Sequence, residues 1–381
     1  MEKFLKLCSS SSVSAILYLM YILLILIIVA ISIYIFFQTY PPFGGKTKQD
    51  IKKHSPNFKN GTFVNQVPTA MDMKPADMLS LLRDQIKGVP DRRPPRVLIP
   101  ERLGTSKAPN EAQVTWFGHS TFLLQIRGKN ILLDPMFGRS PSPIPAIGPQ
   151  RFSNELPAKL EDLPNIDAVL ISHDHYDHLD YGSIKKLSSK TTMFFVPLGL
   201  KAHLLKWGVT PAQVTELDWW DERTFEGFSF VCTSSRHFSG RTLTDRFATL
   251  WCSWVIRTDD TSIFFSGDSG YGPHFKQIGE KYGPFDLTLL ECGQYDPHWS
   301  TIHMTPEQTI QAHVDLRGKR MIPMHWGAFV LAMHSWADPV ERALKAGAKV
   351  EAVIITPRIG ETVAFKSEDY PTEAWWKEYE T

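Results

Sequence analysis

The sequence has few cysteines, and they form no recognisable pattern. Four are present, Cys8, Cys232, Cys252 and Cys292, without a C-x-x-C pair or a regular spacing. A disulfide framework and a zinc site built from thiolates both need such spacing. We therefore expect neither, and any metal ligands should be histidines and aspartates.

The chain also lacks an excess of charge and a serine-nucleophile motif. Its 41 Lys and Arg nearly balance its 40 Asp and Glu, so nothing in the charge indicates a nucleic-acid partner. No G-x-S-x-G is present, which removes the usual signature of a serine hydrolase. The hydrophobic share of 43% in 381 residues is enough for one large core or two modest ones, so we expect a globular protein.

One long apolar run is present, at residues 13–37, and it contains no charged residue. As a helix it would be about 37 Å long, against a hydrocarbon core of about 30 Å. A cleaved signal peptide has a shorter apolar region that ends in small residues, and "YIFFQTYPPF" offers no such site. We predict an N-terminal tail at 1–12 and a retained, single transmembrane helix at 13–37.

The flanking lysines bear on the orientation of this helix. Lys46, Lys48, Lys52 and Lys53 follow it, whereas Lys3 and Lys6 precede it. The positive-inside bias therefore favours a cytoplasmic catalytic domain.

The next region, residues 38–112, is rich in Pro and Lys and contains one helical candidate, "PADMLSLLRDQI", with Pro75 in its first turn. We predict a stalk and lead-in segment that packs along the main domain.

From residue 113 short β-patterned runs alternate with helical ones. Strands are expected at 113–126, 130–135, 166–172, 192–198, 228–235, 250–256, 262–268, 287–291, 320–326 and 350–357, and helices at 181–189, 199–208, 305–316 and 338–348. This order predicts α/β layers over 113–366 rather than a pure β-sandwich, followed by a C-terminal tail at 367–381.

The stretch "SHDHYDHLD", residues 172–180, is the strongest chemical signal. It follows the apolar run "DAVLI", so its side chains should lie at the carboxyl end of a strand, where α/β sheets usually place their sites. Alternate residues of an extended segment point the same way, so His173 and His175 can bind one metal ion. Asp177 and His178, at the following turn, can reach a second.

Three further ligands are expected at other strand ends. His237 follows "FSFVCTS", Asp268 follows "SIFFSG" and His325 follows "RMIPM". A carboxylate can bridge two metal ions because its two oxygens bind separately. Together with 172–180 these residues complete a dinuclear ligand set, with Asp268 as the bridge.

This pattern resembles the metallo-β-lactamase superfamily, and within it the N-acylphosphatidylethanolamine-hydrolysing phospholipases D. The similar stretches include "WFGHST", "DPMF", "GPQRF", "HYDHLDY", "ELDWWDE", "FFSGDSGY" and "HWGAF", and they cover roughly residues 113–330. The resemblance implies an αββα sandwich, two mixed sheets flanked by helices, preceded here by the transmembrane helix. It also implies two zinc ions per chain and a possible homodimer.

The resemblance also assigns ligands and neighbours by position. By this assignment, one zinc ion would be held by His173, His175 and His237. The other zinc ion would be held by Asp177, His178 and His325, and Asp268 would bind both ions. It implies that His303 lines the pocket and contacts a phosphate oxygen, and that Asp134 orients a ligand histidine from behind. His119 either faces the site or shapes a turn. Ile302 stands where the phospholipases carry Gln.

The expected activity is hydrolysis of N-acylphosphatidylethanolamine-like membrane phospholipids to N-acylethanolamine and phosphatidic acid. A hydroxide shared by two zinc ions would attack phosphorus, with Asp177, Asp268 and His303 as catalytic residues. The apolar stretches 141–152 and 326–336 would line an acyl-chain entrance.

Two other functions compete with this one. A lactonase or general phosphodiesterase for a small phosphorylated metabolite would use the same metal loop. A catalytically silent zinc-containing membrane scaffold needs only four ligands, whereas seven are expected here.

Overall fold

The computed structural model describes residues 2–46, 54–69, 80, 83, 88–104 and 111–380, with the backbone alone for residues 2–13. The chain divides into two compact units, Met1–Phe43 and Gly44–Thr381. The helix expected at 75–86 lies outside the described residues, apart from Ser80 and Arg83, which are both helical.

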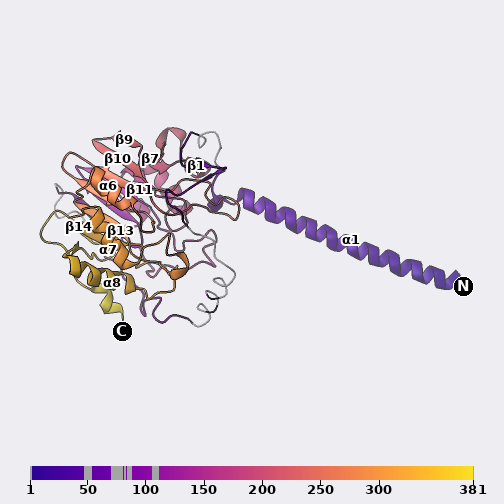
Figure 1. Ribbon diagram of the computed structural model, residues 1–381. Coiled ribbons are helices and arrows are strands. Elements are labelled where there is room, and N and C mark those ends of the chain that lie inside the picture. Colours follow the sequence, from indigo (N-terminus) through magenta and orange to yellow (C-terminus); the bar gives the residue numbers. More distant parts are fainter. Residues whose placement is uncertain are drawn as a thin grey trace. The chain divides into compact units, whose positions relative to one another are not determined.

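The first unit is one helix, α1 (Glu2–Thr39), followed by the 3-10 turn η1 (Pro41–Phe43). Its stretch Ser14–Thr39 has 26 residues and a mean hydropathy of 3.1, so it is long and apolar enough to cross a membrane. Figure 1 shows α1 as a continuous helix. The helix expected at 13–37 is therefore present, and its placement in a membrane stays a prediction.

The second unit is built on two seven-stranded mixed sheets, which we call sheets I and II. Sheet I has the order β16 (Thr362–Ala364), β3 (Gln113–Trp116), β4 (Phe122–Ile126), β5 (Lys129–Leu133), β6 (Ile166–Leu170), β7 (Thr191–Pro197), β8 (Val214–Leu217). Sheet II has the order β15 (Val353–Ile354), β14 (Arg320–Met324), β13 (Leu287–Glu291), β12 (Ser262–Phe265), β11 (Ser253–Arg257), β10 (Phe228–Thr233), β9 (Glu222–Phe225).

The two sheets share one pattern, because each combines antiparallel pairs at one end with parallel pairs at the other. β5 to β8 are parallel in sheet I and β12 to β15 in sheet II. The α-helices within residues 111–380 are α4 (Tyr181–Leu187), α5 (Lys201–Lys206), α6 (His274–Tyr282), α7 (Pro306–Asp315) and α8 (Asp338–Gly347). α6, α7 and α8 lie near strands of sheet II in Figure 1.

Side chains alternate between the two faces of each sheet, and this alternation creates the layers. In β12 Phe264 and Phe265 are both fully buried, but Phe264 packs with Phe275 and Ile278 of α6, whereas Phe265 belongs to the large cluster that spans both sheets. In β4 Leu123 joins the cluster that contains residues of α4 and α5. The expected αββα sandwich is confirmed.

Several elements differ from the sequence predictions. The strand expected at 113–126 is two strands, β3 and β4, separated by a turn at 117–121. Strands β8, β9 and β16 and helix α6 were not expected. A short pair, β1 (Phe58–Lys59) and β2 (Thr62–Phe63), lies in the lead-in region.

The expected C-terminal tail is wrong. Trp375 and Trp376, in the 3-10 segment η7 (Trp375–Tyr379), are 4% and 1% exposed and belong to the core cluster. Trp375 stacks on Trp326 with ring centroids 5.6 Å apart. Residues 367–380 are therefore part of the domain, because two indole rings are too large and apolar to leave in water.

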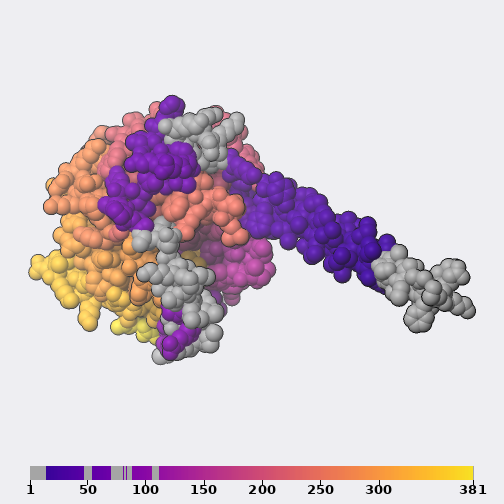
Figure 2. Space-filling model, turned by 45° about the vertical axis from the view of Figure 1, so that its right-hand side comes forward, coloured from indigo at the N-terminus to yellow at the C-terminus, as the bar shows by residue number. Residues whose placement is uncertain are grey.

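The described part of the lead-in region packs against the main domain. Phe63 is 1% exposed and belongs to the core cluster, and its backbone N–H donates to Phe247 O at 3.0 Å. Figure 2 shows the purple side chains of the lead-in region lying against the surface of the second unit. The described lead-in residues from Gly44 on belong to the same compact unit as the main domain.

Candidate metal centre

Four strands end beside the candidate site, and each is followed closely by an expected ligand. β6 ends at Leu170 before His173, β10 at Thr233 before His237, β12 at Phe265 before Asp268, and β14 at Met324 before His325. The pairing directions make β10, β12 and β14 run the same way in sheet II, so their carboxyl ends lie on one edge. This is the edge at which α/β sheets usually place sites.

The structure brings all seven expected metal ligands together. They are His173, His175, Asp177, His178, His237, Asp268 and His325, and their donor atoms fall into groups whose members lie within 4.8 Å of one another. Five of the seven are at most 3% exposed, and His175 and Asp177 are half-buried.

The first group consists of three histidines and Asp268. His175 Nδ1 lies 2.9 Å from His173 Nε2 and 3.2 Å from His237 Nε2. Asp268 Oδ2 lies 3.8 Å from His173 Nε2 and 3.7 Å from His237 Nε2. We call His173, His175 and His237 the three-histidine half.

The second group shares Asp268 with the first. His178 Nε2 lies 3.1 Å from Asp268 Oδ1, and His325 Nε2 lies 3.3 Å from Asp268 Oδ2. Asp177 Oδ2 lies 3.2 Å from His325 Nε2 and 3.4 Å from His178 Nε2. We call Asp177, His178 and His325 the aspartate half, and Asp268 stands between the two halves.

Neighbouring groups fix which ring nitrogen faces inward in three of the histidines, His173, His237 and His325. His237 Nδ1 donates to Ile302 O at 3.0 Å and His325 Nδ1 donates to Gly293 O at 3.2 Å, because a carbonyl oxygen only accepts. His173 Nδ1 lies 2.9 Å from Ser172 Oγ. In each ring Nε2 therefore carries the lone pair that faces the centre, as metal binding requires.

Asp134 holds the aspartate half from behind, as the sequence predicted for a ligand-orienting carboxylate. It is fully buried, and His178 Nδ1 donates to its Oδ2 at 2.7 Å. It also accepts the Ser172 N–H at 2.7 Å and the Ser172 O–H at 2.5 Å. Because Ser172 contacts His173, Asp134 is linked to both halves.

His119 faces the site and also shapes a turn, so both of the open alternatives hold. Its Nε2 lies 2.9 Å from Asp177 Oδ2, and its backbone has a φ of 53°. Asp134 and His325 also have positive φ, 38° and 68°. Such backbone is costly for residues with a Cβ and tends to concentrate at functional sites.

The charges at the centre favour a cation. Burial lowers the pKa of His173 and of His237 well below the usual value for histidine, so both rings are neutral at neutral pH. Burial also acts on His178, but Asp268, Asp177 and Asp134 raise the pKa of His178 well above its usual value. Two buried carboxylates, Asp134 and Asp268, and the half-buried Asp177 thus favour positive charge at the centre.

Two buried atoms at the centre show that a metal ion fits this donor set. Within the described residues His178 Nε2 and Asp268 Oδ1 make no hydrogen bond, although both are buried and 3.1 Å apart. Unpaired buried polar atoms are rare because each costs about 1 to 3 kcal/mol. A metal ion coordinated by both atoms would remove that cost, and imidazole with carboxylate is a normal ligand set for zinc.

His303 lies beside the metal ligands, as predicted, and Glu291 holds it there. His303 Nδ1 donates to Glu291 Oε2 at 2.8 Å, and the ring stacks on His325 with centroids 5.2 Å apart. Burial lowers the pKa of His303, but Glu291 and Asp268 outweigh it and raise the pKa to about 8. The sequence analysis missed Glu291, a charged residue that ends the apolar strand β13 and is fully buried.

A pocket of about 300 Å³ opens onto this centre. Its polar lining includes the expected site residues His175, Asp177, Asp268, His303 and His325, and its other walls include Phe238, Arg246, Gln294, His298, Trp299, Ile302 and Leu331. Of the two stretches expected to line an acyl-chain entrance, 326–336 contributes Leu331, whereas no residue of 141–152 is among the described pocket walls.

The comparisons with known proteins identify one family over this part of the chain. Residues 129–326 match the Beta-lactamase superfamily domain. An uncharacterized protein of Mycobacterium tuberculosis (strain H37Rv) is 40% identical over 334 residues, which are 86% of this chain and 89% of that protein.

Two further matches are an enzyme sequence and a solved structure. The N-acyl-phosphatidylethanolamine-hydrolyzing phospholipase D 1 of Caenorhabditis elegans is 35% identical over 227 residues, 56% of this chain and 64% of that enzyme. The structure of Igni18, a metallo hydrolase of the archaeon Ignicoccus hospitalis, matches with a TM-score of 0.52 and 25% identity, over 67% of this chain and 98% of that one.

Proposed function

Because the chain belongs to the metallo-β-lactamase superfamily of metal-dependent hydrolases, we propose that it is a membrane-anchored phosphodiesterase of the phospholipase D type. Its proposed substrates are N-acylphosphatidylethanolamine-like phospholipids, and its products N-acylethanolamine and phosphatidic acid. The observation that carries this proposal is the cluster of seven donors, four of which (His175, Asp177, Asp268 and His325) line a pocket that also offers apolar surface.

The proposed ligand assignment follows the two halves of the site. The three-histidine half would hold one zinc ion, the aspartate half the other, and Asp268 would bind both. When bound, two zinc ions acidify a shared water towards a pKa of about 7 and stabilise negative charge on phosphoryl oxygens.

The chain's own residues would position the reaction. Asp268 lies between both halves and is 3% exposed, so its carboxylate is placed to orient the attacking water and accept its proton. Attack on phosphorus breaks the bond to the ethanolamine oxygen, which leaves with a proton as N-acylethanolamine. Glu291 binds Nδ1 of His303, which leaves Nε2 as the nitrogen available to a phosphoryl oxygen.

The pocket walls suit a lipid phosphodiester. Phe238, Trp299, Ile302 and Leu331 offer apolar surface, and Arg246, whose guanidinium lies 5.2 Å from the Phe238 ring centroid, offers a cation for an anionic group. We further propose that α1 anchors the enzyme in the bilayer that holds its substrate, with the catalytic domain in the cytoplasm.

The test is product analysis by mass spectrometry. The full-length protein, in detergent with zinc, would be incubated with N-acylphosphatidylethanolamine, phosphatidylethanolamine and phosphatidylcholine, with and without chelator. We expect N-acylethanolamine and phosphatidic acid from the first lipid alone, and none after chelation. Cleavage of bis-p-nitrophenyl phosphate or a lactone without any lipid cleavage would contradict the lipid substrate, and no hydrolysis at all would favour the scaffold.

A further inference from the structure

The described lead-in segment, residues 44–46 and 54–69, contacts the loops that carry the three-histidine half at two separate points. Both contacts join residues more than 120 positions apart in the sequence. The lead-in residues of both contacts, Gly45 and Asn65, lie outside residues 129–326, the region that matches the family, whereas their partners lie inside it.

The first contact is between Asn65 and the backbone of His237. Asn65 Nδ2 donates to His237 O at 2.8 Å, and the His237 N–H donates to Asn65 Oδ1 at 3.1 Å. Trp251 Nε1 also donates to Asn65 Oδ1, at 3.2 Å. One side-chain amide thus occupies both backbone groups of an expected ligand, as a neighbouring strand would.

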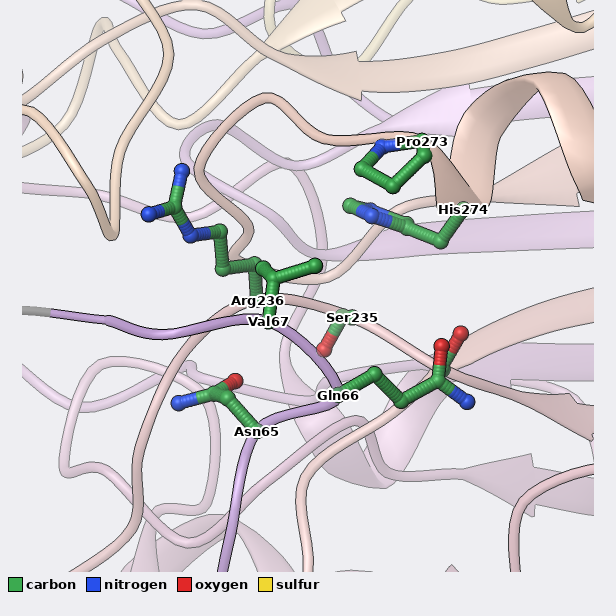
Figure 3. Close-up of a pocket in the computed structure, with 8 residues that line it drawn as sticks. Asn65, Gln66, Val67, Ser235, Arg236, Pro273 and His274 are labelled. Atoms are coloured by element: carbon green, nitrogen blue, oxygen red, sulfur yellow. The ribbon is translucent and has the colours of Figure 1, made fainter.

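Further hydrogen bonds hold the lead-in segment in place beside His237. Arg236 donates from Nη2 to Pro68 O at 2.9 Å and from Nε to Thr69 Oγ1 at 3.1 Å. Figure 3 shows Asn65, Gln66 and Val67 next to Ser235 and Arg236, the two residues that precede His237. The position of Asn65 is therefore fixed by several contacts and not by its own amide alone.

The second contact runs through His203 to the loop that carries His173 and His175. The Gly45 N–H donates to His203 Nδ1 at 3.0 Å, so Nδ1 accepts and the ring proton is on Nε2. That Nε2 lies 3.4 Å from Asp174 Oδ2, and His203 is 2% exposed. Asp174 stands between the two expected ligands in the sequence.

Asp174 also ties this loop to the loop that follows His237. Its Oδ1 accepts the Gly240 N–H at 2.8 Å, and its Oδ2 accepts the Thr249 O–H at 2.9 Å. These two hydrogen bonds, with His203 in contact beside them, restrain the backbone on which His173 and His175 are mounted.

The aspartate half is supported differently. Within the described residues, the three side chains of this half form hydrogen bonds with Asp134, His119 and Gly293, all of which lie outside the lead-in segment. The lead-in segment therefore has a specific relation to one half of the centre.

We propose that the lead-in segment positions the three-histidine half of the metal centre, with Asn65 and His203 as positioning residues. This inference depends on the proposed two-metal site. Loss of either contact should loosen the metal ion bound by His173, His175 and His237 more than the one bound by Asp177, His178 and His325.

The experiment compares Asn65→Ala with Asn57→Ala in the full-length protein. Asn57 is a matched control, because it also joins the lead-in segment to the domain, through Nδ2 and Asp218 Oδ1 at 3.0 Å, but contacts no expected ligand. Zinc per chain would be measured by elemental analysis after dialysis against graded chelator concentrations, with folding followed by circular dichroism.

We expect Asn65→Ala to lose one of two zinc ions at a chelator concentration about 10-fold lower than the wild type or Asn57→Ala. Equal retention in Asn65→Ala and Asn57→Ala would overturn the inference, whereas a wild type without zinc would instead refute the proposed metal centre. If Asn65→Ala does not fold, Asn65→Asp decides, because it keeps the acceptor for His237 N–H and loses the donor to His237 O. Asn65→Asp should show the same selective loss of one zinc ion to a smaller degree. If Asn65→Asp retained zinc as the wild type does, the inference would be contradicted.

Discussion

The two halves of the candidate centre share the support of Asp134, but among the described residues the lead-in segment contacts the loops of one half and not the other. His178 and His325 are oriented by Asp134 and Gly293, which belong to the two sheets and their connecting loops. His237 is held on its backbone by Asn65, and the loop of His173 and His175 is held through Asp174 and His203 by Gly45.

This difference shows that contacts to the site also come from outside the part of the chain that the family model matches. Residues 129–326 contain every expected metal ligand, and Gly45 and Asn65 contact the loops of one half from outside that range.

The largest effect is expected where the halves meet, at Asp268. Asp268→Asn should reduce hydrolysis of bis-p-nitrophenyl phosphate by about 1000-fold or more, because both halves lose their shared carboxylate charge. His175→Ala should have a similar effect, because His175 Nδ1 lies closest to both His173 and His237. Thermal unfolding should show that both variants remain folded; full activity in either would refute the site assignment.

The next effect, at Asp134, should reach both halves. Asp134→Asn removes the charge that holds His178 Nδ1 and Ser172, and Ser172 contacts His173. We expect both zinc ions to bind about 10-fold to 100-fold more weakly, measured by chelator competition. If only one zinc ion were affected, the link through Ser172 would be unimportant.

A smaller effect is expected at Gly45, on the three-histidine half alone. A Cβ at this position would lie 2.0 Å from Ala202 O, so Gly45→Ala must displace the N–H that binds His203. We expect at most about 10-fold weaker binding of one zinc ion. Gly104→Ala is the control, because its Cβ would have nothing within 4 Å; an equal effect of both substitutions would contradict the proposed path through His203.

The smallest effect is expected at His313, which should make folding stability depend on pH even when no metal ion is bound. Burial lowers the pKa of His313, on α7, from 6.5 to about 4. Between these values the unfolded chain binds a proton that the folded chain does not, so stability falls as pH drops from about 6.5 towards 4.

His313→Gln should remove this contribution, about 1.4 kcal/mol per pH unit, from the free energy of unfolding. Urea unfolding at pH 7 and pH 5 in chelator, for both proteins, measures it. An unchanged pH dependence would show that His313 does not titrate as its burial requires.

The sequence could indicate the residues that the structure brings together because their signal is local. An apolar run followed closely by His or Asp indicates both a buried strand and a polar side chain at its carboxyl end. This pattern identified His173, His237, Asp268 and His325. Glu291 carries the same signal at the end of "LTLLE" and was overlooked. The edge strand β9 was missed because most of its residues are exposed and show no alternation.

The supporting contacts were not predictable in this way. Asn65 lies 172 positions from His237, and one polar residue in an irregular segment has no periodicity to mark it. The pair Trp375 and Trp376 did offer a signal, because adjacent large aromatic residues rarely stay in water, and it argued against the expected tail.

The most direct test is a metal count on the full-length wild type, by elemental analysis during stepwise chelation. We predict two zinc ions per chain that leave in two separate steps, and we predict that Asn65→Ala shifts only one of these steps to a lower chelator concentration. A single metal ion per chain, or two that leave together in the wild type and in Asn65→Ala alike, would contradict a centre whose halves are supported by different parts of the chain.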